Sequence, residues 1–237
     1  MNGQPAGREG MSRRPSLASM IVEAAAFMQS FAERDADPPI ASVPRGDGHA
    51  VLVLPSVIRD DAQTAHVRDF LAAIGYTPFG WELGVNLGPT AALLAGAMTR
   101  LNEIAAKHGR VSLVGYSMGG LFARWLAIRA PEHVRQLVTV CSPFRDPTGS
   151  VFVPLEPFLA LWPGVDLRSL AKEIEGPLAV PGTFLYCRND GIVAWEHCID
   201  DAAPEDNIEV AGHHTTMAGN PQVMRILAER LARPLRP

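Results

Sequence analysis

The sequence predicts an α/β fold: a doubly wound, mostly parallel sheet of about six strands between two helix layers, a three-layer αβα architecture. Two observations indicate it. Short continuous apolar runs recur along the chain, and segments with helical periodicity separate them. Such runs are typical of strands buried on both faces, and their alternation with helices implies right-handed βαβ units. With 237 residues, the chain is long enough to bury one sizeable core.

The first 48 residues are predicted to form a tail and one helix, ahead of a main domain at residues 49–237. Apolar residues recur at helical spacing from Ser16 to Glu33, where Ser16 can cap the helix and Pro38-Pro39 ends it. The polar face of this helix lacks the Lys and Arg residues that a membrane-binding helix carries. We therefore expect the helix to dock on the sheet edge or to mediate a homodimer.

Strands and helices then alternate along the main domain. The apolar run at residues 50–54 follows a glycine-containing turn and is predicted to be a strand. Helices are expected at residues 62–74 and 90–108, where apolar residues share one face and a glycine follows. The same reasoning predicts strands at residues 76–81, 111–115, 136–141, 183–187 and 207–210, and helices at residues 118–130 and 221–231.

One stretch interrupts this alternation. Residues 142–181 are rich in proline and apolar side chains, without a clear strand or helix pattern. A crossover of this length usually carries a cap over a functional site. Its aromatic residues Phe152, Phe158 and Trp162 could line a substrate pocket or simply pack the crossover.

The charge balance argues against a nucleic-acid partner, and the pattern of apolar residues argues against a membrane span. The chain carries 21 Lys and Arg against 25 Asp and Glu, a formal net charge of −4. Nucleic-acid grooves need clustered Lys and Arg to displace counterions, so no nucleic-acid partner is expected. The longest uncharged stretch, Leu83–Thr99, is interrupted by Asn86, Pro89 and glycines. A bilayer span needs about 20 apolar residues, so we expect no transmembrane segment.

The cysteines favour a cytoplasmic location. Cys141, Cys187 and Cys198 form an odd set without CxxC spacing, which is typical of reduced thiols in a cytoplasmic protein. A Cys187–Cys198 bridge is left open. The N-terminal apolar run is cut by Glu23 and no small-residue cleavage site follows, so a secretory signal is not expected. Because the sequence has no HExxH motif and no carboxylate cluster, neither a metal nor a cofactor is expected.

The most informative motif is Gly115-Tyr116-Ser117-Met118-Gly119, between a predicted strand and a predicted helix. A sharp strand-to-helix turn crowds the backbone, so it needs small residues two positions before and two after the serine. Such a turn exposes the serine hydroxyl and places the helix N-terminus beneath it, with the Met118 amide directed at a developing oxyanion. The motif therefore predicts that Ser117 is a nucleophile.

A dinucleotide site is the competing interpretation of the same segment. Gly115, Ser117 and Gly120 imitate a GxGxxG spacing, but serine replaces the glycine that lets pyrophosphate approach the backbone. The next strand ends in Cys141-Ser142 and offers no carboxylate for a ribose hydroxyl. Both departures disfavour nucleotide binding.

A serine nucleophile needs a base and a residue that orients the base. Asp190 follows a predicted strand, and His213 and His214 follow the last one. The order Ser117, Asp190, His214 is the chain order of the nucleophile-elbow hydrolases. We favour His214 as the base and keep His213 as the alternative.

These residues and their flanking motifs resemble the α/β-hydrolase superfamily, and more narrowly small lipase-like serine esterases, over about residues 48–233. In that family a second oxyanion donor follows the first strand, which implies the Val57 amide as the partner of Met118. The chain departs from the family pattern at Ser56, His213 and Thr216, where glycine, serine and glycine are usual. The motifs that carry the resemblance are residues 51–55, 80–89, 115–119 and 190–193, and His214 with Met217 and Asn220-Pro221.

The resemblance and the triad together predict a serine esterase that cleaves small carboxylic esters with an apolar acyl chain, without a cofactor. Trp81 could line the acyl pocket or belong to the core. Alternatives with the same triad are an acyltransferase, a thioesterase and a polyester hydrolase. A non-catalytic binding module on this scaffold is disfavoured, because a binder does not need all three of Ser117, Asp190 and His214.

Overall fold

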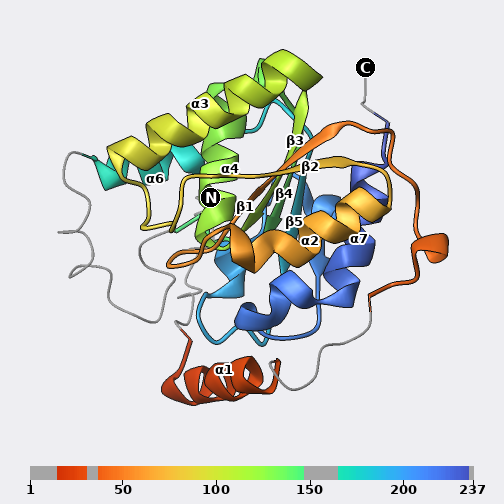
Figure 1. Ribbon diagram of the computed structural model, residues 1–237. Coiled ribbons are helices and arrows are strands. Elements are labelled where there is room, and N and C mark those ends of the chain that lie inside the picture. The colour runs from red at the N-terminus through yellow and green to blue at the C-terminus, as the bar shows by residue number, and fades with distance from the viewer. Residues whose placement is uncertain (1–14, 31–36, 147–164, 235–237) are drawn as a thin grey trace, which may run out of the picture.

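The computed structural model describes residues 15–30, 37–146 and 165–234 (Figure 1). Its strands are β1 (Ala50–Leu54), β2 (Thr77–Gly80), β3 (Val111–Tyr116), β4 (Val134–Val140), β5 (Gly182–Tyr186) and β6 (Asn207–Glu209). They form one sheet in the order β2-β1-β3-β4-β5-β6, and every neighbouring pair is parallel. The predicted six-stranded parallel sheet is confirmed.

Helices cover both faces of the sheet (Figure 1). One face carries α2 (Asp61–Ala73) and α7 (Pro221–Leu231), and the other carries α3 (Ala91–His108) and α4 (Met118–Arg129). Side chains of β1 alternate between the two cores: Val51 and Val53 pack with α2 and α7, whereas Leu52 and Leu54 pack with α3 and α4. Because both faces are covered, all of β1 is buried, which explains its continuous apolar run.

Local capping explains where these helices begin. The side chains of Asp60, Thr90 and Asn220 accept hydrogen bonds from backbone N–H groups of the first turns of α2, α3 and α7. Gly109 ends α3 with a φ of 76°, a conformation that glycine adopts without strain. β4 begins at Val134, earlier than expected, directly after the 3₁₀ turn Pro131–His133.

The crossover contains a helix that its composition did not predict. α6 (Leu167–Ile174) begins where the Asp166 carboxylate accepts the Arg168 and Ser169 amides. Its buried residues Leu170 and Ile174 pack in one cluster with Leu121 of α4. Phe152, Phe158 and Trp162 lie outside the described residues, as does the whole of the predicted cap from residue 147 to residue 164.

The N-terminal helix α1 (Leu17–Ser30) does not dock on a sheet edge as expected. It lies across the carboxyl ends of the strands, against the 3₁₀ helix η5 (His214–Gly219) and the turn at Gly191 (Figure 1). The reason is Glu23, whose carboxylate finds backbone N–H donors in those loops. The homodimer contact stays a prediction.

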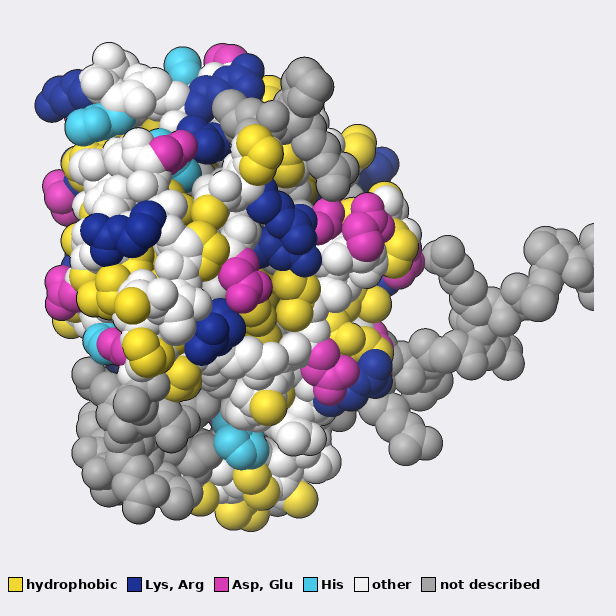
Figure 2. All heavy atoms as spheres, turned by 90° about the vertical axis from the view of Figure 1, so that its right-hand side faces the viewer, with side chains coloured by type: hydrophobic (Ala, Val, Ile, Leu, Met, Phe, Trp, Pro, Cys, Tyr) yellow, Lys and Arg dark blue, Asp and Glu magenta, His cyan; other side chains and the backbone are white. Residues whose placement is uncertain are grey.

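All three cysteines are free and buried, so the Cys187–Cys198 bridge is not formed. Figure 2 shows the side of the molecule that lies to the right in Figure 1. On that face Lys and Arg side chains are interspersed with Asp and Glu. Among the described helices, none combines the length and apolar character needed to cross a bilayer.

Candidate active site

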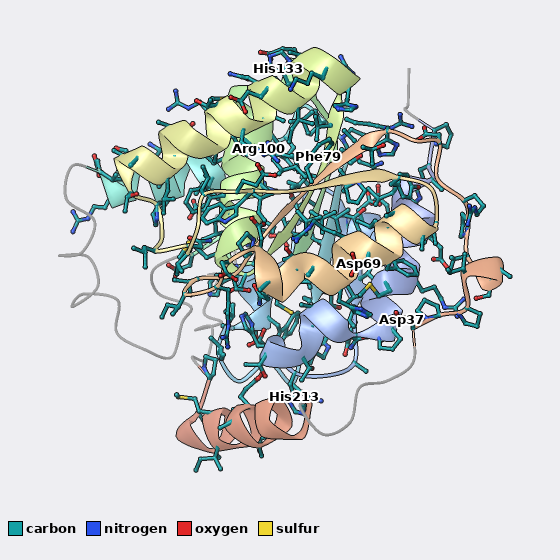
Figure 3. The ribbon with its side chains drawn as sticks, in the orientation of Figure 1. Asp37, Asp69, Phe79, Arg100, His133 and His213 are labelled. Atoms are coloured by element: carbon teal, nitrogen blue, oxygen red, sulfur yellow. The ribbon has the colours of Figure 1, made fainter. Side chains whose placement is uncertain are left out.

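The three predicted triad residues follow three different strands at the same end of the sheet. Ser117 follows β3, Asp190 follows β5, and His214 follows β6. Figure 3 labels one histidine at each end of the sheet: His133 precedes β4, and His213 follows β6. His213 lies beside α1. Ligand sites of open α/β sheets form at this carboxyl end.

Ser117 stands at a strained turn. Its backbone has φ 52° and ψ −118°, a combination that L-residues rarely adopt and that surrounding structure must stabilise. The Ser117 N–H donates to the Val140 carbonyl over 2.8 Å, which ties the turn to the end of β4. Ser117 is also the N-cap of α4, but its side chain makes no capping hydrogen bond. The hydroxyl is therefore available for chemistry.

Three glycines make this turn possible because no side chain fits at their positions. A Cβ on Gly115 would lie 2.4 Å from the Gly119 carbonyl oxygen, and one on Gly119 would lie 2.4 Å from the Leu54 carbonyl oxygen. A Cβ on Gly120 would lie 1.9 Å from Ser142 Oγ. The first two contacts explain the predicted spacing around the serine. The third shows that Gly120, which that spacing does not include, is needed to pack α4 against the end of β4.

The Gly119 contact also brings the two predicted oxyanion donors onto adjoining segments. It sets the N-terminus of α4, with the Met118 amide, against the backbone of Leu54 and Pro55, and Val57 follows two residues later. Neither the Val57 nor the Met118 N–H donates a hydrogen bond within the described part of the chain. Free N–H groups at a helix N-terminus and an adjacent loop are suited to bind an oxyanion.

Two side chains brace the loop that carries Val57, the second predicted oxyanion donor, and the sequence predicted this role for neither of them. Gln63 accepts the Ser56 N–H over 2.8 Å and donates to Ser56 Oγ over 3.0 Å. Asn86, which is fully buried, donates to the Pro55 carbonyl over 2.8 Å and accepts the Gly88 N–H. Ser56, the departure from the family pattern, thus gains a hydroxyl contact that a glycine could not make.

Asp190 and His214 form a buried hydrogen-bonded pair. His214 Nδ1 lies 2.7 Å from Asp190 Oδ2, and the two side chains are 9% and 1% exposed. Asp190 Oδ1 accepts the Ile192 and Val193 amides, which orients the carboxylate. With Nδ1 as the donor, the neutral ring carries its lone pair on Nε2, the tautomer that a general base requires.

Burial alone would lower the pKa of His214, but other groups outweigh it. The charge of Asp190 and its hydrogen bond, together with the charge of Glu23, raise the pKa above the ordinary histidine value. An imidazolium is therefore stabilised at this position.

His213 has no such partner. Its Nδ1 is buried and makes no hydrogen bond within the described part of the chain. The structure thus brings His214, and not His213, to Asp190. Ser117 Oγ makes no hydrogen bond to either ring among the described residues, and catalytic hydrogen bonds of this kind often tighten only when substrate binds.

A buried thiol completes the surroundings of the pair. Ligand atoms of Cys141, Asp190 and His214 lie within 4.8 Å of one another. Burial, followed by the charge of Asp190, raises the pKa of the Cys141 thiol well above its ordinary value. Cys141 therefore lies beside the Asp190–His214 pair as a buried free thiol.

Trp81 is a core residue in this structure. Its side chain is 1% exposed, packs edge-to-face against Phe122 and donates to the Gly84 carbonyl. This placement gives no support to its expected role in lining an acyl pocket. The other three expected pocket residues, in the 152–162 segment, lie outside the described residues.

A second Ser–His–Asp chain lies at the amino end of the sheet. His49 Nε2 is 2.8 Å from Ser112 Oγ, and His49 Nδ1 is hydrogen-bonded to Asp47. Ser112 is fully buried within β3, so no substrate can reach its hydroxyl. Ser117 differs from this structural serine because it is only partly buried and stands at a sharp turn.

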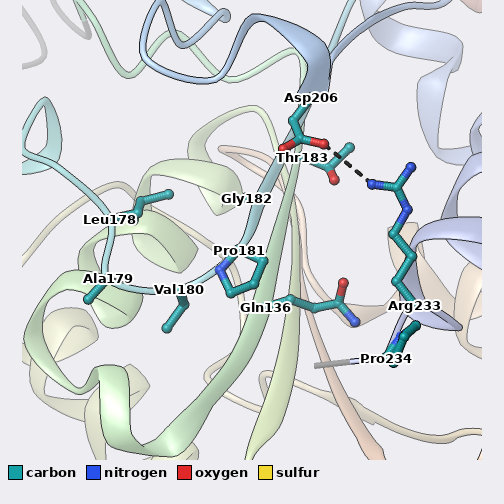
Figure 4. Close-up of a pocket in the computed structure, with 10 residues that line it drawn as sticks. All are labelled: Gln136, Leu178, Ala179, Val180, Pro181, Gly182, Thr183, Asp206, Arg233 and Pro234. Carbon is teal, nitrogen blue, oxygen red and sulfur yellow. Dashed lines mark hydrogen bonds and ion pairs between the residues drawn. The ribbon is translucent and has the colours of Figure 1, made fainter. Parts of the chain in front are cut away.

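A cavity of about 360 Å³ also lies away from the Asp190–His214 pair (Figure 4). It opens beside the amino ends of β4 and β5 and is lined by the 178–183 segment, Gln136 and the Asp206–Arg233 ion pair. None of the predicted site residues lines it.

Comparisons with known proteins agree with this architecture. A family model described as the alpha/beta hydrolase fold matches residues 95–180. One similar solved structure comes from work on LipS and LipT, two metagenome-derived lipolytic enzymes (15% identity, 82% of this chain and 97% of that chain, TM-score 0.59). Others are the carboxylesterase CesB from Bacillus subtilis (13%, 92% and 100%, 0.53) and the thioesterase domain from the curacin biosynthetic pathway (12%, 81% and 93%, 0.51). No curated protein sequence matches the chain significantly. At these identities the likeness to the solved structures concerns the fold alone.

Proposed function

We propose, because the chain has the α/β-hydrolase fold, that it is a serine hydrolase that cleaves carboxylic esters through an acyl-enzyme on Ser117. The observation that carries this proposal is the buried 2.7 Å hydrogen bond between Asp190 and His214. It lies at the sheet end where Ser117 occupies a strained strand-to-helix turn. A protein that only binds ligands has no need of this combination.

The reaction begins when Ser117 Oγ attacks the ester carbonyl and His214 Nε2 accepts the hydroxyl proton. His214 then protonates the leaving alcohol, which departs and leaves the acyl group on Ser117. Water, deprotonated by His214, attacks the acyl-enzyme. As the acid is released, His214 returns the proton to Ser117 Oγ. Asp190 keeps the imidazole in the required tautomer throughout, and no cofactor takes part.

The oxyanion of each tetrahedral intermediate is bound by the amides of Met118 and Val57. Loss of one such donor typically costs about 10²–10³-fold in rate. The bracing of the Val57 loop by Gln63 and Asn86 therefore serves catalysis as well as stability.

Exposed apolar side chains around the oxyanion loop support an apolar ester as the substrate. Ile58 and Leu87 are 67% and 60% exposed, and Val57 and Val85 are also exposed. The two loops that carry them are joined by backbone hydrogen bonds between Ile58 and Asn86 and between Asn86 and Arg59. Exposed apolar groups of this kind often mark a binding surface, here for the acyl or alcohol portion of the ester.

The direct test is a series of p-nitrophenyl esters of increasing acyl length, with a thioester of matched acyl chain and a fluorophosphonate probe. We expect ester hydrolysis, preference for apolar acyl chains and covalent labelling by the probe. Addition of a competing alcohol or amine separates hydrolysis from acyl transfer. Transfer product in excess of free acid would reassign the protein to the acyltransferases, and a stable complex with intact ester would make it a binding module.

The pKa of His214 predicts the pH dependence of the reaction. His214 must be neutral to accept the proton of Ser117, and its pKa is raised above the ordinary value of 6.5. Activity therefore rises as the pH increases through this raised pKa, and we expect the acidic limb of kcat/KM to have its midpoint above 6.5. Initial rates from pH 5 to 9 with a neutral ester measure it. A midpoint at lower pH would contradict the assignment of His214 as the base.

A further inference from the structure

Glu23 is a buried carboxylate that the proposed mechanism does not use. It is the single charged residue of α1 and is 3% exposed. No ion pair to Glu23 is present among the described residues. An isolated carboxylate would be costly to bury, so its hydrogen bonds must compensate.

Four hydrogen bonds do so, and all come from the loops that carry Asp190 and His214. Glu23 Oε1 accepts the Gly191 N–H over 3.0 Å and the His214 N–H over 2.7 Å. Glu23 Oε2 accepts the Thr215 N–H over 3.2 Å and the Thr215 hydroxyl over 3.0 Å. Hydrogen bonds to a charged acceptor are roughly twice as strong as neutral ones.

The partners of Glu23 lie in two loops that follow the neighbouring, paired strands β5 and β6. Gly191 directly follows Asp190 in the loop after β5, whereas His214 begins η5 after β6. One carboxylate oxygen accepts from both loops, so Glu23 constrains the separation of the acid and the base. The fit is close, because a Cβ on Gly191 would lie 2.5 Å from both Glu23 Cγ and the Ser19 carbonyl oxygen.

We propose that Glu23 is a positioning residue of the active site, which holds the backbone on both sides of the Asp190–His214 pair and so sets the imidazole toward Ser117. The N-terminal helix α1, which belongs neither to the sheet nor to the helices that cover its faces, then contributes a residue to the active site. The proposal rests on the proposed function, in which His214 is the base.

Glu23 also contributes charge to the site, which distinguishes positioning in the active site from a purely structural contact. The groups that face His214 are Asp190 from the loop after β5, Glu23 from α1 and Cys141 at the end of β4. Burial lowers the pKa of His214, and the negative charges of Asp190 and Glu23 raise it. Removing the Glu23 charge must therefore lower that pKa and shift the acidic limb of kcat/KM to lower pH.

The experiment compares Glu23→Gln and Glu23→Ala with the wild type and with Glu209→Gln. Glu209 is an exposed carboxylate at the same end of the sheet, and its ion pair with Arg188 is exposed as well. Its substitution removes the same charge but none of the hydrogen bonds to Gly191, His214 or Thr215. Glu23→Gln retains the side-chain length and one carbonyl acceptor but loses the charge. Glu23→Ala loses all four hydrogen bonds.

For Glu23→Ala we expect kcat to fall by about 10- to 100-fold, as for outer hydrogen-bond partners of metal-ligating histidines, with KM little changed. For Glu23→Gln we expect a smaller loss of kcat and an acidic limb at lower pH than in the wild type. Glu209→Gln should match the wild type in kcat and in the midpoint of the acidic limb. Unchanged kcat, or a lower kcat with an unchanged pH midpoint in Glu23→Gln, would overturn the proposal.

A second measurement does not depend on ester hydrolysis. The His214 imidazole is titrated by NMR in wild type and Glu23→Gln, with its resonance assigned by comparison with His214→Ala. A lower titration midpoint in Glu23→Gln supports the proposal even if Glu23→Ala fails to fold, and an equal midpoint overturns it. If the wild type hydrolyses no ester, the proposed function fails, while this titration still tests the coupling of Glu23 to His214.

Discussion

Replacing Ser117 by alanine is expected to lower kcat for ester hydrolysis by about 10⁴-fold or more. The change removes the only atom that can form the acyl-enzyme in the proposed mechanism. It leaves the turn itself intact, because the Ser117 hydroxyl makes no capping hydrogen bond. The loss should therefore appear in activity and in fluorophosphonate labelling, with little change in the thermal unfolding midpoint.

Ser112→Ala is the matched control for this prediction. Ser112 lies on the same strand and is also hydrogen-bonded to a histidine that contacts an aspartate, but it is fully buried. We expect Ser112→Ala to keep ester hydrolysis and labelling near the wild-type level. The stability should fall, since His49 loses a buried hydrogen-bond partner. Hydrolysis that survives in Ser117→Ala would refute the assignment of the nucleophile.

Replacing His214 by alanine is expected to produce a loss comparable to that in Ser117→Ala, because nucleophile and base act as one unit. The hydrogen bond of His214 Nδ1 to Asp190 supports the proposal that this ring is the base. Without the His214 ring, the Ser117 hydroxyl has no proton acceptor at neutral pH in the proposed mechanism. Steady-state kinetics on one p-nitrophenyl ester, together with the rate of fluorophosphonate labelling, measure the effect.

His213→Ala is the control one residue away. The His213 ring makes no hydrogen bond through Nδ1 within the described part of the chain, so its loss should change kcat by only a few-fold. Unlike His214, it has no link to Asp190. Equal losses in the two variants would show that the choice between the two histidines is unsupported.

Much of the fold could be predicted because its signals are local and periodic. The continuous apolar run at residues 50–54 predicts a buried strand, and β1 is apolar throughout because both of its faces are covered. The spacing of Gly115 and Gly119 around Ser117 follows from steric contact within one turn. α6 escaped prediction because it is short and lies in a proline-rich stretch whose composition favours loop.

The sequence by itself determined the layered fold and the Ser117 turn, because strand and helix periods and glycine sterics act over a few residues. Only the tertiary structure decided which histidine meets Asp190, since adjacent residues in one loop differ only in where their side chains point. The same holds for Glu23, whose partners lie 168 and 191 residues further along the chain. As sequence it is a lone carboxylate within an apolar helix. Its role depends on long-range packing, which no local pattern encodes.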